Sequence, residues 1–129
     1  MIEIERVDYV RVPVRDIEQA KHFYGELLGL RENPNSPADD WIEYEAANVT
    51  LAVMTPETHD YEFTPLPPGT LAFRVPDVAA AKAKLEAAGV QVNEVWDSGV
   101  CRGAGISDPD GNRILLHRRY APYPDGTMP

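Results

Sequence analysis

The side chains that could do chemistry in this 129-residue chain are few and stand far apart in the sequence. The three histidines are His22, His59 and His117, and no His-X-His, His-Glu-X-X-His or Cys-X-X-Cys spacing occurs. Such spacings bring two ligands to one metal ion or two thiols together. Their absence means that the sequence contains no local motif for a metal site or a redox-active thiol pair. The single cysteine, Cys101, has no evident base beside it, and we interpret it as a small buried filler.

His117 is the first candidate for acid–base chemistry, because an imidazole can donate, accept or titrate near neutral pH. The alternative is a histidine packed at a strand end and satisfied by backbone or solvent. Arg11, Arg74 and Arg113 could orient a carboxylate or another anion, or could be surface charges near strand ends. Tyr9 could cover a ligand with its ring and bind it through its hydroxyl, or could be a core residue with a wet tip.

The first half of the chain predicts a strand, a helix and a strand pair that would position these residues. Val10, Val12 and Val14 alternate with Arg11 and Pro13, as the residues of a half-buried strand do. Asp16 then caps a helix whose apolar residues fall at helical spacing and which ends at Gly29. Two further strands, 41–45 and 49–54, pair across a short turn.

The second half repeats this order after a proline-rich linker over residues 55–69, which is too rich in proline for a regular element. Asp77 caps a second helix, which Gly89 ends. The other predicted elements are strands over 71–75, 90–96, 102–107 and 113–119, and a tail from Tyr120 onward.

The two halves align as an internal repeat. An offset of 61 residues relates Asp16 to Asp77 and Tyr24 to Leu85, so one offset aligns strand and helix together. The last strands align at an offset of 63, which pairs Leu51 with Ile114. Either half alone would bury too little apolar surface to fold, so the halves are expected to share a core or an interface.

Several segments, in this order and duplicated, resemble the vicinal oxygen chelate superfamily, which includes glyoxalase I, extradiol dioxygenases, fosfomycin-resistance enzymes and bleomycin-resistance proteins. They are Val10–Ile17, Phe23-Tyr24, Leu28–Leu30 and the turn Asp108–Asn112. The resemblance implies an α+β fold of two βαβββ modules whose sheets curl around a central cavity. It predicts a single domain over 1–129, with module one over about 4–55, a linker over about 56–68, module two over about 69–119 and a tail over 120–129.

In metal-dependent members of the family that the chain resembles, His, Glu or Gln side chains from the first and last strands of each module hold a divalent ion. The matching positions here are Tyr9, Ala52, Thr70 and Leu115. Alanine and leucine have no donor atom, and a neutral hydroxyl binds divalent ions poorly compared with imidazole or carboxylate. We therefore expect no metal and no other cofactor, as in the bleomycin-resistance branch.

Side-chain alternation places a set of residues on the sheet faces that would line the cavity. Three small residues, Gly103–Gly105, are expected to leave room for a ligand near the backbone. The resulting pocket would have apolar patches, an aromatic wall and a few polar groups, as small-molecule sites do. The candidate ligand-binding residues are Tyr9, Arg11, Trp41, Glu43, Ala52, Met54, Thr70, Ala72, Arg74, Gly103, Leu115 and His117.

Composition limits the partners. A net charge of -9 repels phosphate backbones, so nucleic acid is not expected as a partner, and no apolar run is long enough to cross a membrane. The N-terminal residues do not resemble a secretory signal, so we expect a cytoplasmic location. The family resemblance further predicts a homodimer, although the sequence does not say whether one chain or two would build the pocket.

Three functions remain open from the sequence. The first is a metal-independent protein that sequesters or carries a small, partly apolar organic compound. The second is a lyase, isomerase or dioxygenase, either with an unconventional metal set involving His117 and Glu43 or with His117 as acid or base. The third is an interaction module that binds no small molecule.

Overall fold

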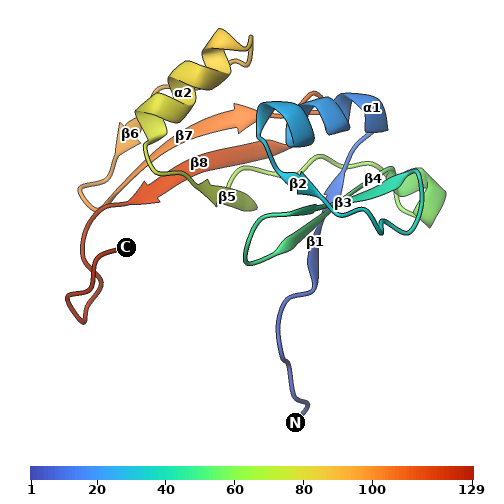
Figure 1. The fold of residues 1–129 in the computed structure, drawn as a ribbon, viewed down its shortest axis with the longest axis horizontal. Helices are drawn as coiled ribbons and strands as arrows, with labels where there is room; N and C mark the ends of the chain where they lie inside the picture. Colours follow the sequence, from blue (N-terminus) through green and yellow to red (C-terminus); the bar gives the residue numbers. More distant parts are fainter. The chain divides into compact units, whose positions relative to one another are not determined.

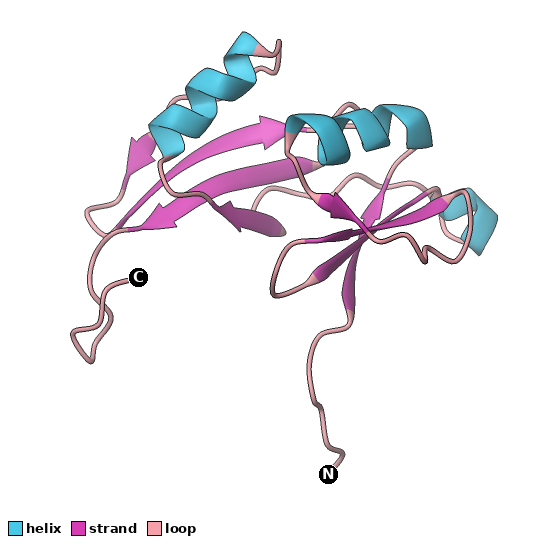
Figure 2. Ribbon diagram, viewed as in Figure 1, coloured by secondary structure: helices cyan, strands magenta, loops and turns pink.

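A computed structural model describes all 129 residues and contains two four-stranded mixed sheets, each with its longest helix on one face (Figures 1 and 2). The chain divides into two compact units, Met1–Pro65 and Leu66–Pro129, and each unit contains one sheet. The fold is α+β, and the predicted duplication of one strand-helix-strand pattern is confirmed. Each sheet is open, with two edge strands.

The first unit has the strand order β1-β4-β3-β2, in which β1 runs parallel to β4 and the other neighbours are antiparallel. Its elements are β1 (Tyr9–Pro13), α1 (Ile17–Ala20), a continuation of that helix (Lys21–Leu27), β2 (Arg31–Glu32), β3 (Trp41–Glu45), β4 (Thr50–Met54) and a short 3₁₀ turn (Pro56–His59). The 3₁₀ turn falls within the predicted linker, which was expected to contain no regular element. It can form there because its proline lies at the start of the turn, where proline is tolerated.

The first helix begins as predicted and then widens. The Asp16 side chain accepts hydrogen bonds from the backbone N–H groups of Glu18 and Gln19, and Gly29 adopts the left-handed conformation expected of a helix end. From Lys21 onward the turns are of the π type, and the Leu28 N–H donates to the Phe23 carbonyl, five residues back. The spacing of the apolar residues did not predict this change from an α-helix to a π-helix.

The core of the first unit lies between its helix and its sheet. Its members are apolar residues on one face of the strands, together with two adjacent helix aromatics, and all are nearly inaccessible to solvent. They are Val12, Val14, Phe23, Tyr24, Ile42, Tyr44, Leu51 and Val53. Because these side chains occupy one face of the sheet, only the opposite face is available for a ligand-binding site.

The second unit repeats the topology with the order β5-β8-β7-β6, in which β5 runs parallel to β8. Its elements are β5 (Leu71–Arg74), α2 (Val78–Ala87), β6 (Trp96–Asp97), β7 (Cys101–Ser107) and β8 (Arg113–Arg119). Helix α2 lies against β7 and β8 (Figure 1). Asp77 caps it by accepting a hydrogen bond from the Ala80 N–H, the role that the repeat predicted.

The predicted strand over 90–96 is wrong for most of its length. Only Trp96–Asp97 forms a strand, and Val92 makes a single bridge to Ile106. The Lys82 ammonium group donates to the carbonyls of Val92 and Asn93, at 3.0 and 3.1 Å. These carbonyls are satisfied by a helix side chain, so the segment does not need a complete ladder.

The turn between β7 and β8 contains the buried polar pair Asp108 and Asn112. The Asn112 amide donates to the Asp108 carboxylate at 2.7 Å, and its oxygen accepts from the Leu66 N–H at 2.8 Å. The turn therefore fixes the end of the linker to the start of β8. No helix in the structure has the length and apolar character needed to cross a membrane.

Candidate functional site

The sheet face of the first unit that lies opposite the core carries six of the predicted site residues. Strand pairing places Arg11, Ala52 and Glu43 side by side in one row across β1, β4 and β3. Tyr9, Trp41 and Met54 belong to the neighbouring rows on the same face. The register thus brings these six positions together as the alternation predicted, and it leaves their role in binding untested.

Two aromatic rings form a wall on this face. The Tyr9 and Trp41 rings meet edge to face, with centroids 5.5 Å apart. The Trp41 indole N–H donates to the Glu43 carboxylate at 3.0 Å, which fixes the indole orientation. Ala52 and Met54 have no exposed surface, so they form a floor beneath other side chains and do not themselves reach solvent.

Linker residues add to this face, and no pattern in the sequence predicted their position. The His59 ring lies 5.2 Å from the Trp41 ring, and its Nε2 is 3.6 Å from the Asp40 carboxylate. A hydrogen bond from Thr58, with a smaller contribution from the nearby imidazole, lowers the pKa of Asp40. Arg11 stacks on Tyr61, with its guanidinium carbon 3.9 Å from the ring centroid.

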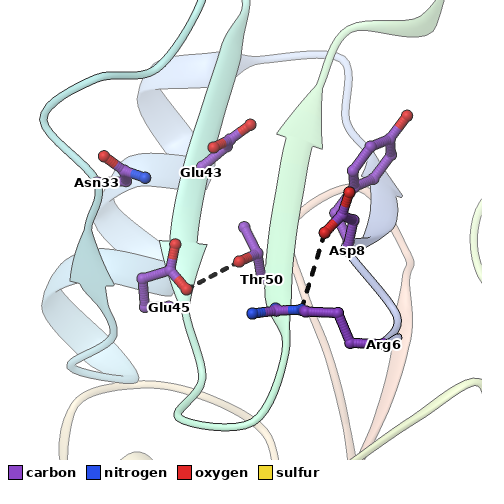
Figure 3. A pocket seen from close by; sticks show the side chains of 7 residues that line it. Arg6, Asp8, Asn33, Glu43, Glu45 and Thr50 are labelled. Atoms are coloured by element: carbon purple, nitrogen blue, oxygen red, sulfur yellow. Dashed lines mark hydrogen bonds and ion pairs between the residues drawn. The ribbon is translucent and has the colours of Figure 1, made fainter. Parts of the chain in front are cut away.

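A cavity of about 300 Å³ opens at the β1 start of this face. Figure 3 shows polar side chains around it from β3, β4, the loop before β3 and the segment before β1. Thr50 donates to Glu45 at 2.8 Å, and Arg6 lies 3.8 Å from Asp8. The lining residues are Arg6, Asp8, Tyr9, Asn33, Glu43, Glu45 and Thr50, of which only Tyr9 and Glu43 were predicted.

In the second unit, strand pairing joins Arg74, His117 and Gly103 in one row, and Ala72 and Leu115 in the next. His117 is half-buried, and its ring centroid lies 6.1 Å from that of Trp96. Thr70 precedes β5, is exposed, and donates its hydroxyl to the Pro67 carbonyl at 3.0 Å. Five predicted residues therefore share a face, and Thr70 lies just outside the strand.

The expectation that Gly103–Gly105 leave open room is corrected. A Cβ atom at Gly103 would overlap the Trp96 indole, and one at Gly105 would lie 3.0 Å from the Asn93 amide. Ala104 points to the opposite, buried face, as strand alternation requires. The small residues make space for two side chains of the protein itself, and Asn93 and Trp96 were not among the predicted site residues.

A family model described as the Glyoxalase/Bleomycin resistance protein/Dioxygenase superfamily matches residues 6–116. The chain belongs to this superfamily. No curated protein matches the sequence. The Glyoxalase/Bleomycin resistance fold is also seen in solved structures, which include a glyoxalase family protein of Bacillus anthracis at 26% identity and a TM-score of 0.75, over 92% of this chain and 98% of that one.

Another similar structure is TnmS3, an antibiotic binding protein of Streptomyces sp. CB03234. It is 32% identical, has a TM-score of 0.72, and is matched over 92% of this chain and 99% of its own. Lactoylglutathione lyase of Agrobacterium tumefaciens, at 19% identity and a TM-score of 0.72 over 88% of this chain and 93% of that one, shares the fold alone.

The residues at the four positions that the family resemblance matches to metal ligands, Tyr9, Ala52, Thr70 and Leu115, do not fit a divalent ion. Ala52 is a buried methyl group and Leu115 is a half-buried alkyl chain, and neither can coordinate. Tyr9 and Thr70 carry neutral hydroxyl groups, which bind divalent ions poorly compared with imidazole or carboxylate. Nowhere in the chain do three His, Cys, Asp or Glu side chains cluster as a metal site would require.

Proposed function

We propose that this protein binds a small, partly apolar organic compound without a metal ion, and so sequesters or carries that compound. The observation that carries the proposal is the pairing of an aromatic wall, Tyr9 and Trp41, with the donor-free side chain of Ala52 at a superfamily metal position. Similarity to a protein described as antibiotic binding supports a binding function over most of the chain.

The proposed ligand contacts combine apolar and polar groups, as small-molecule sites generally do. In the first unit, the Tyr9–Trp41 wall would cover a ring, and Glu43 and Arg11 would accept from or donate to polar substituents. Ala52 and Met54 would support the wall from below. The residues proposed from the second unit are Thr70, Ala72, Arg74, Gly103, Leu115 and His117.

A thermal-shift screen of aromatic and polycyclic compounds, with and without EDTA, tests this proposal. A compound present at about 100 times its Kd should stabilise the fold by roughly 2.7 kcal/mol, which is a shift of several degrees in Tm. EDTA should leave the shift unchanged, and Tyr9→Ala should reduce it while the control Tyr123→Ala does not. A screen without hits would favour the interaction module, and shifts that EDTA abolishes would favour a metal-dependent function.

An enzyme of the same superfamily is the second candidate. The observation in its favour is the half-buried imidazole of His117, which makes no hydrogen bond within the chain and belongs to a residue type suited to acid–base catalysis. If His117 acts as acid or base, His117→Gln should abolish turnover of a bound compound while its Kd changes little. Equal effects on turnover and binding would contradict catalysis by this residue.

The proposal also includes a cytoplasmic homodimer. Edge strands such as β1 and β2 each keep one side without a strand partner, which supports association through strand edges. Light scattering coupled to size-exclusion chromatography should then give twice the 14.3 kDa mass of the chain. A mass equal to that of one chain would contradict the dimer.

A further inference from the structure

Three side chains that can carry positive charge lie on one sheet face of the second unit. Arg74 pairs with His117 across β5 and β8, and Arg119 follows His117 at the next position on the same side of β8. None of the three forms an ion pair with a carboxylate. Unpaired arginines are notable in a chain with 21 acidic and only 12 Lys and Arg residues.

No carboxylate compensates the charge of these groups, and the Arg119 guanidinium lies over the Tyr123 ring, 5.1 Å from its centroid. Arg74 is exposed and makes no side-chain hydrogen bond, while Arg119 donates to the Pro122 carbonyl and has a buried Nε atom without a partner. A bound anion would accept charge-assisted hydrogen bonds from Arg74 and a hydrogen bond from the neighbouring His117 ring N–H.

An aromatic platform lies beside the cationic groups. Trp96 packs on Gly103 so closely that only glycine fits beneath its ring, yet the residue keeps 42% of its surface exposed. One side of the indole is therefore supported by backbone while the rest stays accessible. Because Gly103 pairs with His117, the platform stands on the same face as the imidazole, with 6.1 Å between ring centroids.

We infer that this face, formed by Arg74, Trp96, Gly103 and His117, binds a planar aromatic compound that carries a carboxylate or a similar anionic oxygen group. The ring of the ligand stacks on Trp96, and the anionic group accepts hydrogen bonds from Arg74 and His117. The inference rests on the proposed function and narrows the ligand to aromatic anions.

The test compares 2-naphthoate with its neutral counterpart 2-naphthalenemethanol by NMR titration of ¹⁵N-labelled protein. The readouts are the Trp96 indole N–H and the Gly103 amide, with Trp96→Phe used to assign the indole signal. Naphthoate should bind at least about fivefold more tightly than the alcohol, and this preference should shrink as salt is added. Arg74→Gln should remove most of the preference, whereas Arg31→Gln, a control on β2 of the other unit, should keep it.

Equal affinity for naphthoate and the alcohol would overturn the inference, and so would the absence of shifts at Trp96 and Gly103. A naphthoate preference that persists in Arg74→Gln and in high salt would also overturn it. The salt titration uses the unmodified protein, so the inference stays testable if a variant fails to fold. If instead the alcohol shifts only the Trp41 indole signal, the proposed binding function stands and the assignment of an aromatic anion to this face falls.

Discussion

Tyr9 and Trp41 come from β1 and β3, strands that are not neighbours, yet their rings meet edge to face at 5.5 Å. The strand between them, β4, places Ala52 at this point of the face, and its side chain is completely buried. A large side chain at that position would occupy the space where the rings approach each other. The small side chain of Ala52 therefore permits the aromatic wall.

Ala52→Leu should separate the two rings and strain the sheet. Overpacking a filled site typically costs about 1–3 kcal/mol in the free energy of unfolding, and binding of any compound that uses the wall should weaken with it. Urea denaturation measures the first effect and thermal-shift binding the second. The control Ala79→Leu, at an exposed position of α2, should change stability by less than about 0.5 kcal/mol. Full stability and binding in Ala52→Leu would contradict the packing described for this face.

Asn112→Ala should destabilise the second unit strongly. The change leaves the Asp108 carboxylate without its 2.7 Å amide donor and the Leu66 N–H without its acceptor. The loss of a partner in this way costs about 1–3 kcal/mol for each group, so a total loss of about 2–6 kcal/mol is expected in chemical denaturation. Asn35→Ala, an exposed asparagine without a side-chain role beyond its own turn, should stay within about 1 kcal/mol of the parent. Similar losses in both variants would show that the turn does not anchor the linker.

Gly103→Ala should displace Trp96, because the added methyl group overlaps a rigid indole ring. Gly105→Ala should perturb the sheet less, since its neighbour is the flexible Asn93 side chain. In a Trp41→Phe background Trp96 is the only tryptophan, so its fluorescence maximum reports its exposure directly. A clear shift in Gly103→Ala and little change in Gly105→Ala are expected. An unchanged maximum in Gly103→Ala would mean that the indole does not pack on this glycine.

Tyr44 should make the protein sensitive to alkaline pH. Burial, with added repulsion from Glu32 and nearby acidic residues, raises the pKa of Tyr44 to about 12. The unfolded phenol ionises near pH 10, so stability should be unaffected below that pH and fall as pH rises from 10 to 12, by on the order of 1–2 kcal/mol. Tyr44→Phe should remove this part of the pH dependence in urea titrations at pH 9 and 11. An identical alkaline loss in Tyr44→Phe would assign the effect to another group.

The sequence predicted those features that local chemistry determines. Asp16 and Asp77 cap their helices because an aspartate before an apolar helical pattern satisfies free N–H groups, and the 61-residue offset between them identified the repeat. Alternation along β1 and β8 placed Arg11 and His117 on the correct faces, because the strand period is fixed.

Features that depend on contacts between distant segments could not be predicted in this way. His59 and Tyr61 reach the first face from a proline-rich linker whose path no local pattern specifies. Trp96 fills the space over Gly103, which the glycine-rich sequence had suggested was open to a ligand. The cavity of about 300 Å³ collects Arg6, Asp8 and Asn33 from segments without regular periodicity.

Quantitative elemental analysis tests whether this protein binds its ligand without a metal ion. The protein should be purified without chelators or an affinity tag. It should be compared with a second sample that is incubated with added metal and then separated from unbound metal by gel filtration. We expect far less than one equivalent of zinc, iron, nickel or manganese per chain in both samples, because Ala52 and Leu115 offer no donor atoms. One equivalent of any of these metals, retained through gel filtration, would contradict the account.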